Sequence, residues 1–256
     1  MTKIVSLANQ KGGVGKTTTA INLGASLAAC ERRVLLVDLD PQANATSGLG
    51  LSKNEENSMY PVLVDGLSLR SIIRPTELVM LYVAPSSVDL VGAELELASM
   101  EQREFRLRSA LQDVGSEYDY ILVDSPPSLG LLTINGLTAA DSVLVPMQCE
   151  YFAIEGIAQL LNTIERVRDA LNPRLEIEGI ALTMFDERMN LARQVAEEVR
   201  GHFGEKVYRT VIPRNVRLGE APSFGKPIIL YDIRSRGSEA YVNLAKEFIA
   251  RAENVI

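Results

Sequence analysis

The chain has 256 residues, of which 46% are hydrophobic and 23% charged, and its formal net charge is −7. These values are ordinary for a single globular domain spanning residues 1–256, and no apolar run approaches the roughly 18 residues of a membrane span. The two cysteines, Cys30 and Cys149, form no C-x-x-C pair, and His202 is the only histidine, which argues against a disulfide framework, a zinc site and Ser-His-Asp catalysis. We therefore expect a protein of the reducing cytoplasm.

Strands and helices are predicted to alternate along the chain. Apolar runs predict strands over 3–8, 34–38, 120–124, 142–146 and 177–184, and helical spacing predicts helices over 16–29, 152–170, 190–203 and 238–252. In the helix over 190–203 the inward face is expected to carry Leu191, Val195, Val199 and Phe203. Residues 52–75 show no clear periodicity, and we expect surface structure there. The alternation predicts an α/β fold with a doubly wound, mostly parallel sheet flanked by helices, with ligands at the carboxyl ends of its strands.

A glycine-rich loop joins the first predicted strand to the first predicted helix. The strict phosphate-loop pattern G-x-x-x-x-G-K-[S/T] fails because Gln10 occupies the first glycine position. The physical requirements are still met by the eight residues Lys11, Gly12, Gly13, Val14, Gly15, Lys16, Thr17 and Thr18. Glycines let backbone N–H groups face phosphate oxygens, the helix N-terminus adds its dipole, Lys16 can reach the β- and γ-phosphates, and Thr17 can bind Mg²⁺. The alternative is a flexible turn with two solvated lysines, but the flanking strand and helix favour an ATP site.

Carboxylates follow two other predicted strands. Asp38 ends the strand over 34–38 and Asp40 follows two residues later, and Asp124 ends the strand over 120–124 as a metal-binding aspartate of a nucleotide hydrolase would. Phosphoryl transfer depends mainly on positioning and charge stabilisation, so a carboxylate that orients water suffices without histidine. The alternatives are that Asp38 and Asp40 cap the next helix and that Asp124 is a turn residue. Since all three groups are expected at one edge of the sheet with the glycine-rich loop, we favour a Mg²⁺-dependent ATPase.

The loop KGGVGKTT resembles the hallmark of the ParA/MinD group of deviant P-loop ATPases. This resemblance implies an ATP-dependent homodimer, in which the residue matching Lys11 crosses to the partner's nucleotide. It also implies that Asp40 positions the attacking water and that Asp38 lies near the metal. Pro213 and Asn215 match the adenine-contacting segment of the group.

Longer stretches resemble the chromosomal ParA (Soj) subgroup, of which VIPRNVRLGEAPSFGKPI is the most specific. The resemblance implies a dimer that binds double-stranded DNA without sequence preference on the nucleoid. A ParB-type partner with a basic N-terminus would then stimulate hydrolysis and release the dimer, which positions chromosome origins. Ala43 departs from the glycine of many relatives, and we expect no consequence.

Three alternatives remain open within the same superfamily. One is a relative that positions a protein cargo by the same DNA-bound cycle. Another is a MinD-like membrane ATPase, which is disfavoured because the tail over 247–256 has little basic character, so no membrane partner is expected. The third is an ATP-dependent metallochaperone or reductase.

Basic residues concentrate near the C-terminus. Residues 206–236 carry seven basic and two acidic side chains, a charge of +5 that leaves −12 for the rest of the chain. Such a local basic surface suits contact with phosphate backbones. By the resemblance, the candidates for DNA binding are Arg188, Arg214, Arg217, Lys226, Arg234 and Arg236. Any one of them alone is more often an ordinary solvated side chain, and it is their clustering that supports a DNA-binding role for the group. No aromatic residues alternate with them in base-stacking fashion, which favours duplex DNA over single strands.

Overall fold

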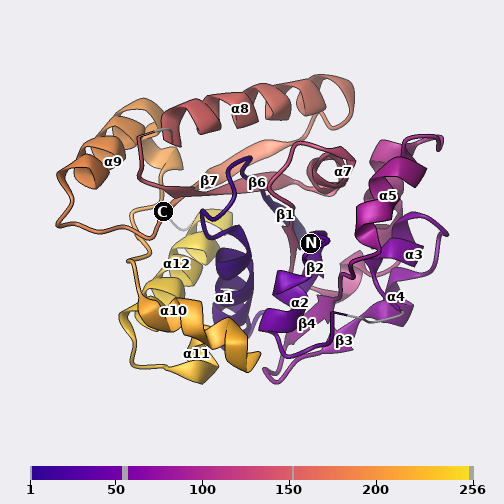
Figure 1. Ribbon diagram of the computed structural model, residues 1–256, viewed down its shortest axis with the longest axis horizontal. Helices are drawn as coiled ribbons and strands as arrows, with labels where there is room; N and C mark the ends of the chain where they lie inside the picture. Colours follow the sequence, from indigo (N-terminus) through magenta and orange to yellow (C-terminus); the bar gives the residue numbers. More distant parts are fainter. Residues whose placement is uncertain (1, 54–56, 152, 254–256) are drawn as a thin grey trace.

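The fold is a twisted sheet with helices on both faces (Figure 1). The computed structural model describes residues 2–53, 57–151 and 153–253. Within these residues the sheet has seven strands in the order β3-β4-β2-β5-β1-β6-β7, all parallel to their neighbours except β3. The predicted doubly wound, mostly parallel sheet is therefore confirmed. The strands are β1 (Lys3–Leu7), β2 (Val34–Asp38), β3 (Arg74–Pro75), β4 (Leu81–Ala84), β5 (Tyr120–Asp124), β6 (Ser142–Gln148) and β7 (Glu176–Thr183).

The central strands are buried on both faces because successive side chains point in opposite directions. In β2, Val34 and Leu36 belong to one core cluster, whereas Leu35 and Val37 belong to another on the opposite face. Every residue of β2 and β5 is buried. Continuous apolar runs of this kind therefore require helices on both sides of the sheet.

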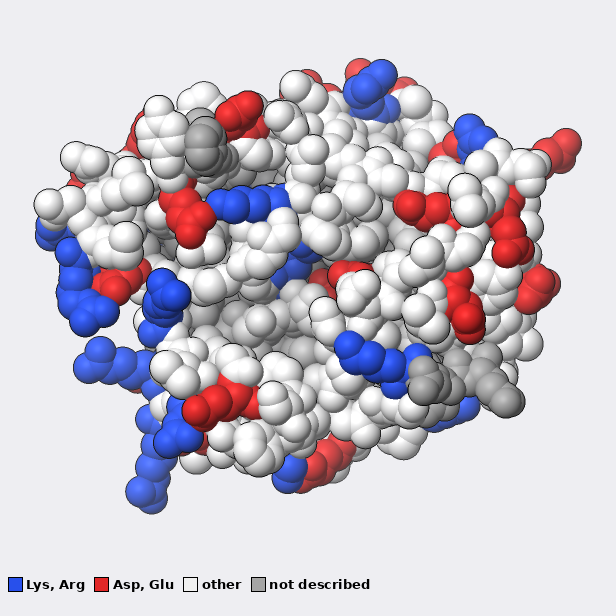
Figure 2. Space-filling view, viewed as in Figure 1, with Lys and Arg blue, Asp and Glu red and all other residues white. Residues whose placement is uncertain are grey.

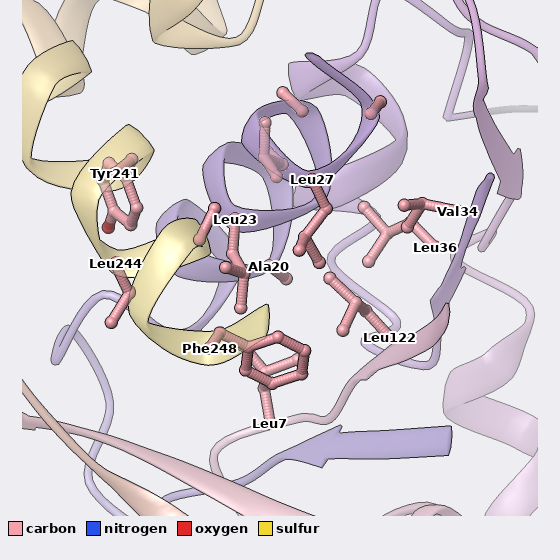
Figure 3. Packing of buried hydrophobic residues seen from close by; sticks show 14 of the residues in the cluster. Leu7, Ala20, Leu23, Leu27, Val34, Leu36, Leu122, Tyr241, Leu244 and Phe248 are labelled. Carbon is pink, nitrogen blue, oxygen red and sulfur yellow. The ribbon is translucent and has the colours of Figure 1, made fainter. Parts of the chain in front are cut away.

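Two long helices, α1 and α12, cover one face. Figure 3 shows α1 and α12 next to each other over the sheet, with Leu27 of α1 near Leu122 of β5 and Phe248 of α12 near Leu7 of β1. Helices α3 to α9 cover the other face. The helices are α1 (Lys16–Ala29), α2 (Asn44–Gly48), α3 (Met59–Leu63), α4 (Leu69–Ile72), α5 (Leu90–Leu97), α6 (Arg106–Gln112), α7 (Leu131–Ala139), α8 (Ala153–Ala170), α9 (Asn190–Phe203), α10 (Val216–Glu220), α11 (Ile228–Tyr231) and α12 (Arg236–Ala252).

The predicted strands and helices are all present, with ends that differ from the predictions by at most two residues. Phe152, the first residue of the predicted helix over 152–170, lies outside the described residues, as do the last three residues of the tail over 247–256. In the part of the chain that the structure describes, no helix is both long and apolar enough to cross a bilayer.

Two expectations were wrong. Residues 52–75 are not merely surface structure, because α3 and α4 bury Met59, Leu63, Leu69 and Ile72 completely in the core. These helices have one turn each, which is too short for a periodic pattern. In α9 the side chain of Leu191 is 41% exposed, and the buried positions are Ala192, Val195, Ala196 and Val199.

Candidate functional site

The candidate site lies where three neighbouring strands end. β5 lies between β1 and β2, and Asp124 is the register partner of Leu7 on one side and of Asp38 on the other. The glycine-rich loop leaves the sheet directly after β1 and leads into α1. Because parallel strands end at the same edge, the loop and both aspartates come together, as the sequence predicted.

The glycine-rich loop is held in a curved conformation by its glycines and by hydrogen bonds to neighbouring strands. Gly13 and Gly15 have φ values of 74° and 82°, in the left-handed region that favours glycine. The Thr183 hydroxyl at the end of β7 donates to the Val14 carbonyl at 2.7 Å, and the Lys11 amide donates to the Asn9 side chain at 3.0 Å. Asn9 and Thr183 therefore fix the loop, although nothing in the sequence singled them out.

Lys16 extends into the curve of this loop. Its ammonium donates to the Lys11 carbonyl at 3.3 Å, its side chain is buried, and it forms no ion pair with any residue that the structure describes. Burial lowers the pKa of Lys16, and the nearby carboxylates of Asp124 and Asp40 partly offset that effect. A buried ammonium without a bonded counter-ion is suited to receive an anion.

Asp124 is a completely buried carboxylate whose two oxygens accept no hydrogen bond within the described residues. Burial, followed by the charge of Asp38, raises the pKa of Asp124 well above its ordinary value, while the nearby Thr17 hydroxyl lowers it. Such orphaned oxygens are rare in folded proteins, and a divalent cation would satisfy them.

The residues present fit Mg²⁺ bound together with a nucleotide. No group of three or more His, Cys, Asp or Glu side chains within the described ranges could hold a metal by itself. Mg²⁺ at phosphate sites is commonly held by one or two protein oxygens, with phosphate and water supplying the remaining ligands. Thr17 and Asp124 offer such a set at the start of α1 and the end of β5.

Asp38 differs from Asp124 although the two are register partners. Its carboxylate accepts hydrogen bonds from the Thr46 amide at 2.8 Å, the Thr46 hydroxyl at 2.7 Å and the Asp40 amide at 3.1 Å. Burial is the main reason that the pKa of Asp38 is raised to about 6. Asp38 thus accepts hydrogen bonds from the first turn of α2, whose N-cap residue is Ala43, and direct binding to a metal would require it to release at least one of these bonds.

Asp40 lies in the turn that follows β2. Its carboxylate accepts from the Gln42 amide at 2.9 Å, and its carbonyl accepts from the Ser86 hydroxyl at 2.7 Å. The Ser86 amide donates to the Thr46 hydroxyl at 2.9 Å, so the segment after β4 is connected to both aspartates. Sequence reasoning missed Thr46 and Ser86, because a lone hydroxyl residue in a loop carries no distinguishing pattern.

The side chain of Lys11 points away from the loop that contains it. Its ammonium forms an ion pair with Glu150, which follows β6 in the same chain. Lys11 is therefore held at the rim of the site, whereas Lys16 occupies the interior of the loop. Glu150 was not singled out in the sequence.

A pocket of about 230 Å³ adjoins the loop on the side of α1 and α10. Gly15 and Thr18 line it together with Pro213 and Asn215, the pair expected near adenine. Asn215 also caps α10 by accepting from the Arg217 amide at 2.8 Å. The structure thus places the predicted adenine segment beside the predicted phosphate loop.

The six basic candidates do not share one environment. Arg188 forms an ion pair with Asp186, Arg217 with Glu220, and Lys226 with Glu77. Arg214, Arg234 and Arg236 are exposed and form no ion pair with the residues that the structure describes. Figure 2 shows basic side chains gathered at the lower left, the region where Figure 1 places α10. The three unpaired arginines are the candidates whose charge is least offset.

Comparison with known proteins gives consistent results. Residues 2–177 match the family model described as "AAA domain". The chain is 60% identical over 251 residues to the sporulation initiation inhibitor protein Soj of Bacillus subtilis, covering 98% of this chain and 99% of that protein. It is 58% identical over 250 residues to the chromosome partitioning protein ParA of Myxococcus xanthus, covering 97% and 88%. Among solved structures, the chain is similar to cobyrinic acid a,c-diamide synthase from Mycobacterium smegmatis, which was solved with a bound ATP analogue and magnesium. The two match with a TM-score of 0.88 and 36% sequence identity, and the match covers 100% of this chain and 98% of that one.

Proposed function

This chain belongs to the ParA/Soj family of chromosome-partitioning proteins, and from that membership we propose that its ATP-bound form is a homodimer that binds DNA without sequence preference. The protein is an ATP hydrolase with ATP as substrate and Mg²⁺ as cofactor. In the proposed cycle a ParB-type partner stimulates hydrolysis and releases the dimer from the nucleoid. Residues 1–256 act as a single P-loop domain in this proposal.

The direction of Lys11 is the observation that carries the proposal. Its ammonium is paired with Glu150 at the rim, while Lys16 already supplies a positive charge inside the loop. A second lysine is thus not needed by the chain's own phosphates, and once it is released from Glu150 it can reach a nucleotide bound by a second copy. In this arrangement each copy completes the other's site, which explains why dimerisation would depend on ATP.

Different residues of the site would bind the phosphates, bind the metal and orient the attacking water. Backbone N–H groups of Gly12–Thr18 and the Lys16 ammonium would hold the phosphates, and Thr17 and Asp124 would hold the metal. When bound, Mg²⁺ would supply positive charge that offsets the charge developing on the phosphates. Asp40, which is almost fully buried at the same edge, orients the attacking water. Asp38 helps to position Asp40, because the Asp38 carboxylate accepts a hydrogen bond from the Asp40 amide.

DNA binding is assigned to the basic region around α10 and the start of α12. Arg214, Arg234 and Arg236 are exposed and unpaired within the described residues, so they can contact phosphates without first breaking an ion pair. Contacts of this kind are electrostatic and independent of sequence.

The test is co-sedimentation with plasmid or with liposomes, with and without ATP. We expect ATP-dependent binding to plasmid and none to liposomes. Replacing Arg214, Arg234 and Arg236 together with alanine should lower the slope of log affinity against log salt by about 2.7 for each protomer of the dimer that contacts DNA, since each phosphate contact contributes about 0.9. The control is Arg108→Ala, an exposed arginine on α6, which should leave the slope unchanged. Sedimentation with liposomes but not with plasmid would contradict the proposed function.

A further inference from the structure

Helix α5 exposes an apolar face that nothing in the described structure covers. Val88, just before the helix, and Val91 and Leu95 within it are 61%, 62% and 81% exposed. Their spacing of three and four residues places them on one side. The opposite side of α5 is fully buried in the core. Because a surface helix normally turns polar residues outward, an apolar outer face of this kind marks a surface for a partner.

Carboxylates surround this face. Asp65, Asp89 and Glu96 are exposed, and none of them forms an ion pair with a residue that the structure describes. The Tyr60 hydroxyl donates to Glu96 at 2.7 Å, and the charges of Asp65 and Asp89 also act on Tyr60. Tyr60, Val88, Asp89 and Glu96 line an open hollow between α3 and α5. Figure 2 shows acidic side chains gathered at the right, where Figure 1 places α3 and α5.

The start of α5 is connected to the catalytic edge. Ser86, which lies between β4 and α5, donates its hydroxyl to the Asp40 carbonyl and its amide to the Thr46 hydroxyl. Thr46 in turn donates to the carboxylate of Asp38. A ligand that displaced the start of α5 would therefore move the groups that position the water-orienting carboxylate.

We propose that the outer face of α5 docks a basic amphipathic segment of the partner that stimulates hydrolysis. This inference rests on the proposed function and adds the place and chemistry of contact. Lysine or arginine side chains of the segment would pair with Asp65, Asp89 and Glu96, while its apolar side chains cover Val91 and Leu95. A second copy of the chain fits poorly, because a symmetric contact through this face would bring carboxylates against carboxylates.

Binding of a synthetic peptide tests the assignment. The probe is a fluorescein-labelled 18-residue helix of about equal parts lysine and leucine, with its anisotropy measured without DNA. Leu95→Lys and Val79→Lys are a matched pair, since both side chains are 81% exposed. Val79 precedes β4, at the amino end of that strand, whereas α5 follows the carboxyl end. We expect Leu95→Lys to weaken binding by about tenfold or more, and Val79→Lys to bind like the wild type.

A second measurement separates this inference from the proposed function. The peptide should accelerate ATP hydrolysis by the wild type and by Val79→Lys but not by Leu95→Lys, while basal hydrolysis and plasmid binding stay equal in all three. Equal peptide affinity for the two variants, or no binding to the wild type, would overturn the docking site. Loss of ATP-dependent dimerisation by Leu95→Lys would also overturn it, because a second copy would then cover α5. Absence of plasmid binding by the wild type would instead contradict the proposed function, whatever the peptide does.

Discussion

Replacing Asp124 with asparagine should stabilise the nucleotide-free protein and abolish the stabilisation that Mg²⁺ and ATP provide together. The wild-type carboxylate is completely buried, with no hydrogen-bond partner for either oxygen in the described residues. An unsatisfied buried neutral group costs about 1–3 kcal/mol, and a charged one costs more. If the difference is about 2 kcal/mol, the melting temperature rises by roughly 4–8 °C, because each kcal/mol shifts a chain of this size by about 2–4 °C.

The effect of pH follows from the same burial. Since burial raises the folded-state pKa of Asp124, the folded protein holds this proton more tightly than the unfolded chain does. The contribution to stability is complete below the unfolded pKa of about 3.9 and is lost as the pH rises through the folded pKa. The stability advantage of Asp124→Asn over the wild type should therefore be absent at low pH and grow with rising pH.

Thermal unfolding followed by circular dichroism, with and without Mg²⁺ and ATP, measures both effects. At one hundred times its dissociation constant the ligand should stabilise the wild type by about 2.7 kcal/mol, and Asp124→Asn by far less. Asp119→Asn is the control, because Asp119 precedes the same strand at the opposite edge and its exposed carboxylate accepts from the Arg33 amide. A lower melting temperature for nucleotide-free Asp124→Asn, or undiminished stabilisation by Mg²⁺ and ATP, would refute the reasoning.

Four further substitutions probe other parts of the site. Lys16→Ala should abolish ATP binding in calorimetry, since it removes the buried ammonium from the loop. Asp40→Ala should retain ATP and remain on plasmid, and rapid turnover would exclude the role given to this carboxylate. Glu150→Gln should raise ATP-dependent dimer formation in analytical ultracentrifugation several-fold, because Lys11 no longer has an ionic partner in its own chain; an unchanged dimer fraction would argue against this. Ala43→Gly should change the free energy of unfolding by less than about 1 kcal/mol, because two opposing effects nearly cancel. Glycine relieves the left-handed backbone of Ala43 (φ 50°), which stabilises the fold. The lost buried methyl group and the greater entropy of unfolded glycine destabilise it.

The sequence predicted the central sheet and the phosphate loop well because their signals are local. A short continuous apolar run such as Val34–Val37 is typical of a strand buried on both faces, and its end at an aspartate marks the carboxyl edge. The backbone has positive φ at Gly13 and Gly15, a conformation that favours glycine, and the glycines that permit it are visible in the sequence. Features that depend on the type of a residue at its own position, such as these apolar strands and loop glycines, can therefore be predicted from the sequence.

The elements that were missed depend on contacts distant in sequence. α3 and α4 have one turn each, and their burial comes from packing against the sheet and α6. The expected inward position of Leu191 was wrong because Ala192 and Ala196, which are small, lie in the contact with α8 and the sheet. Small residues carry little hydrophobic signal although they allow close helix packing. The pairing of Glu150 with Lys11 could not be predicted, because it depends on the fold bringing the end of β6 close to the loop after β1.

Position at the edge of the sheet does not by itself assign a role to a carboxylate. Asp38 and Asp124 are register partners on adjacent strands and looked equivalent in the sequence as groups near the metal. The structure separates them by their hydrogen bonds, because Thr46 and the Asp40 amide satisfy Asp38, whereas no hydrogen bond of good geometry reaches Asp124 within the described residues and only the nearby Thr17 hydroxyl and Lys16 charge favour its ionised form. A cation gains most by binding the group that its own chain stabilises least, so Asp124 is the stronger metal candidate. Asp38 is better placed to couple the turn that carries Asp40, through Thr46 and Ser86, to the start of α5.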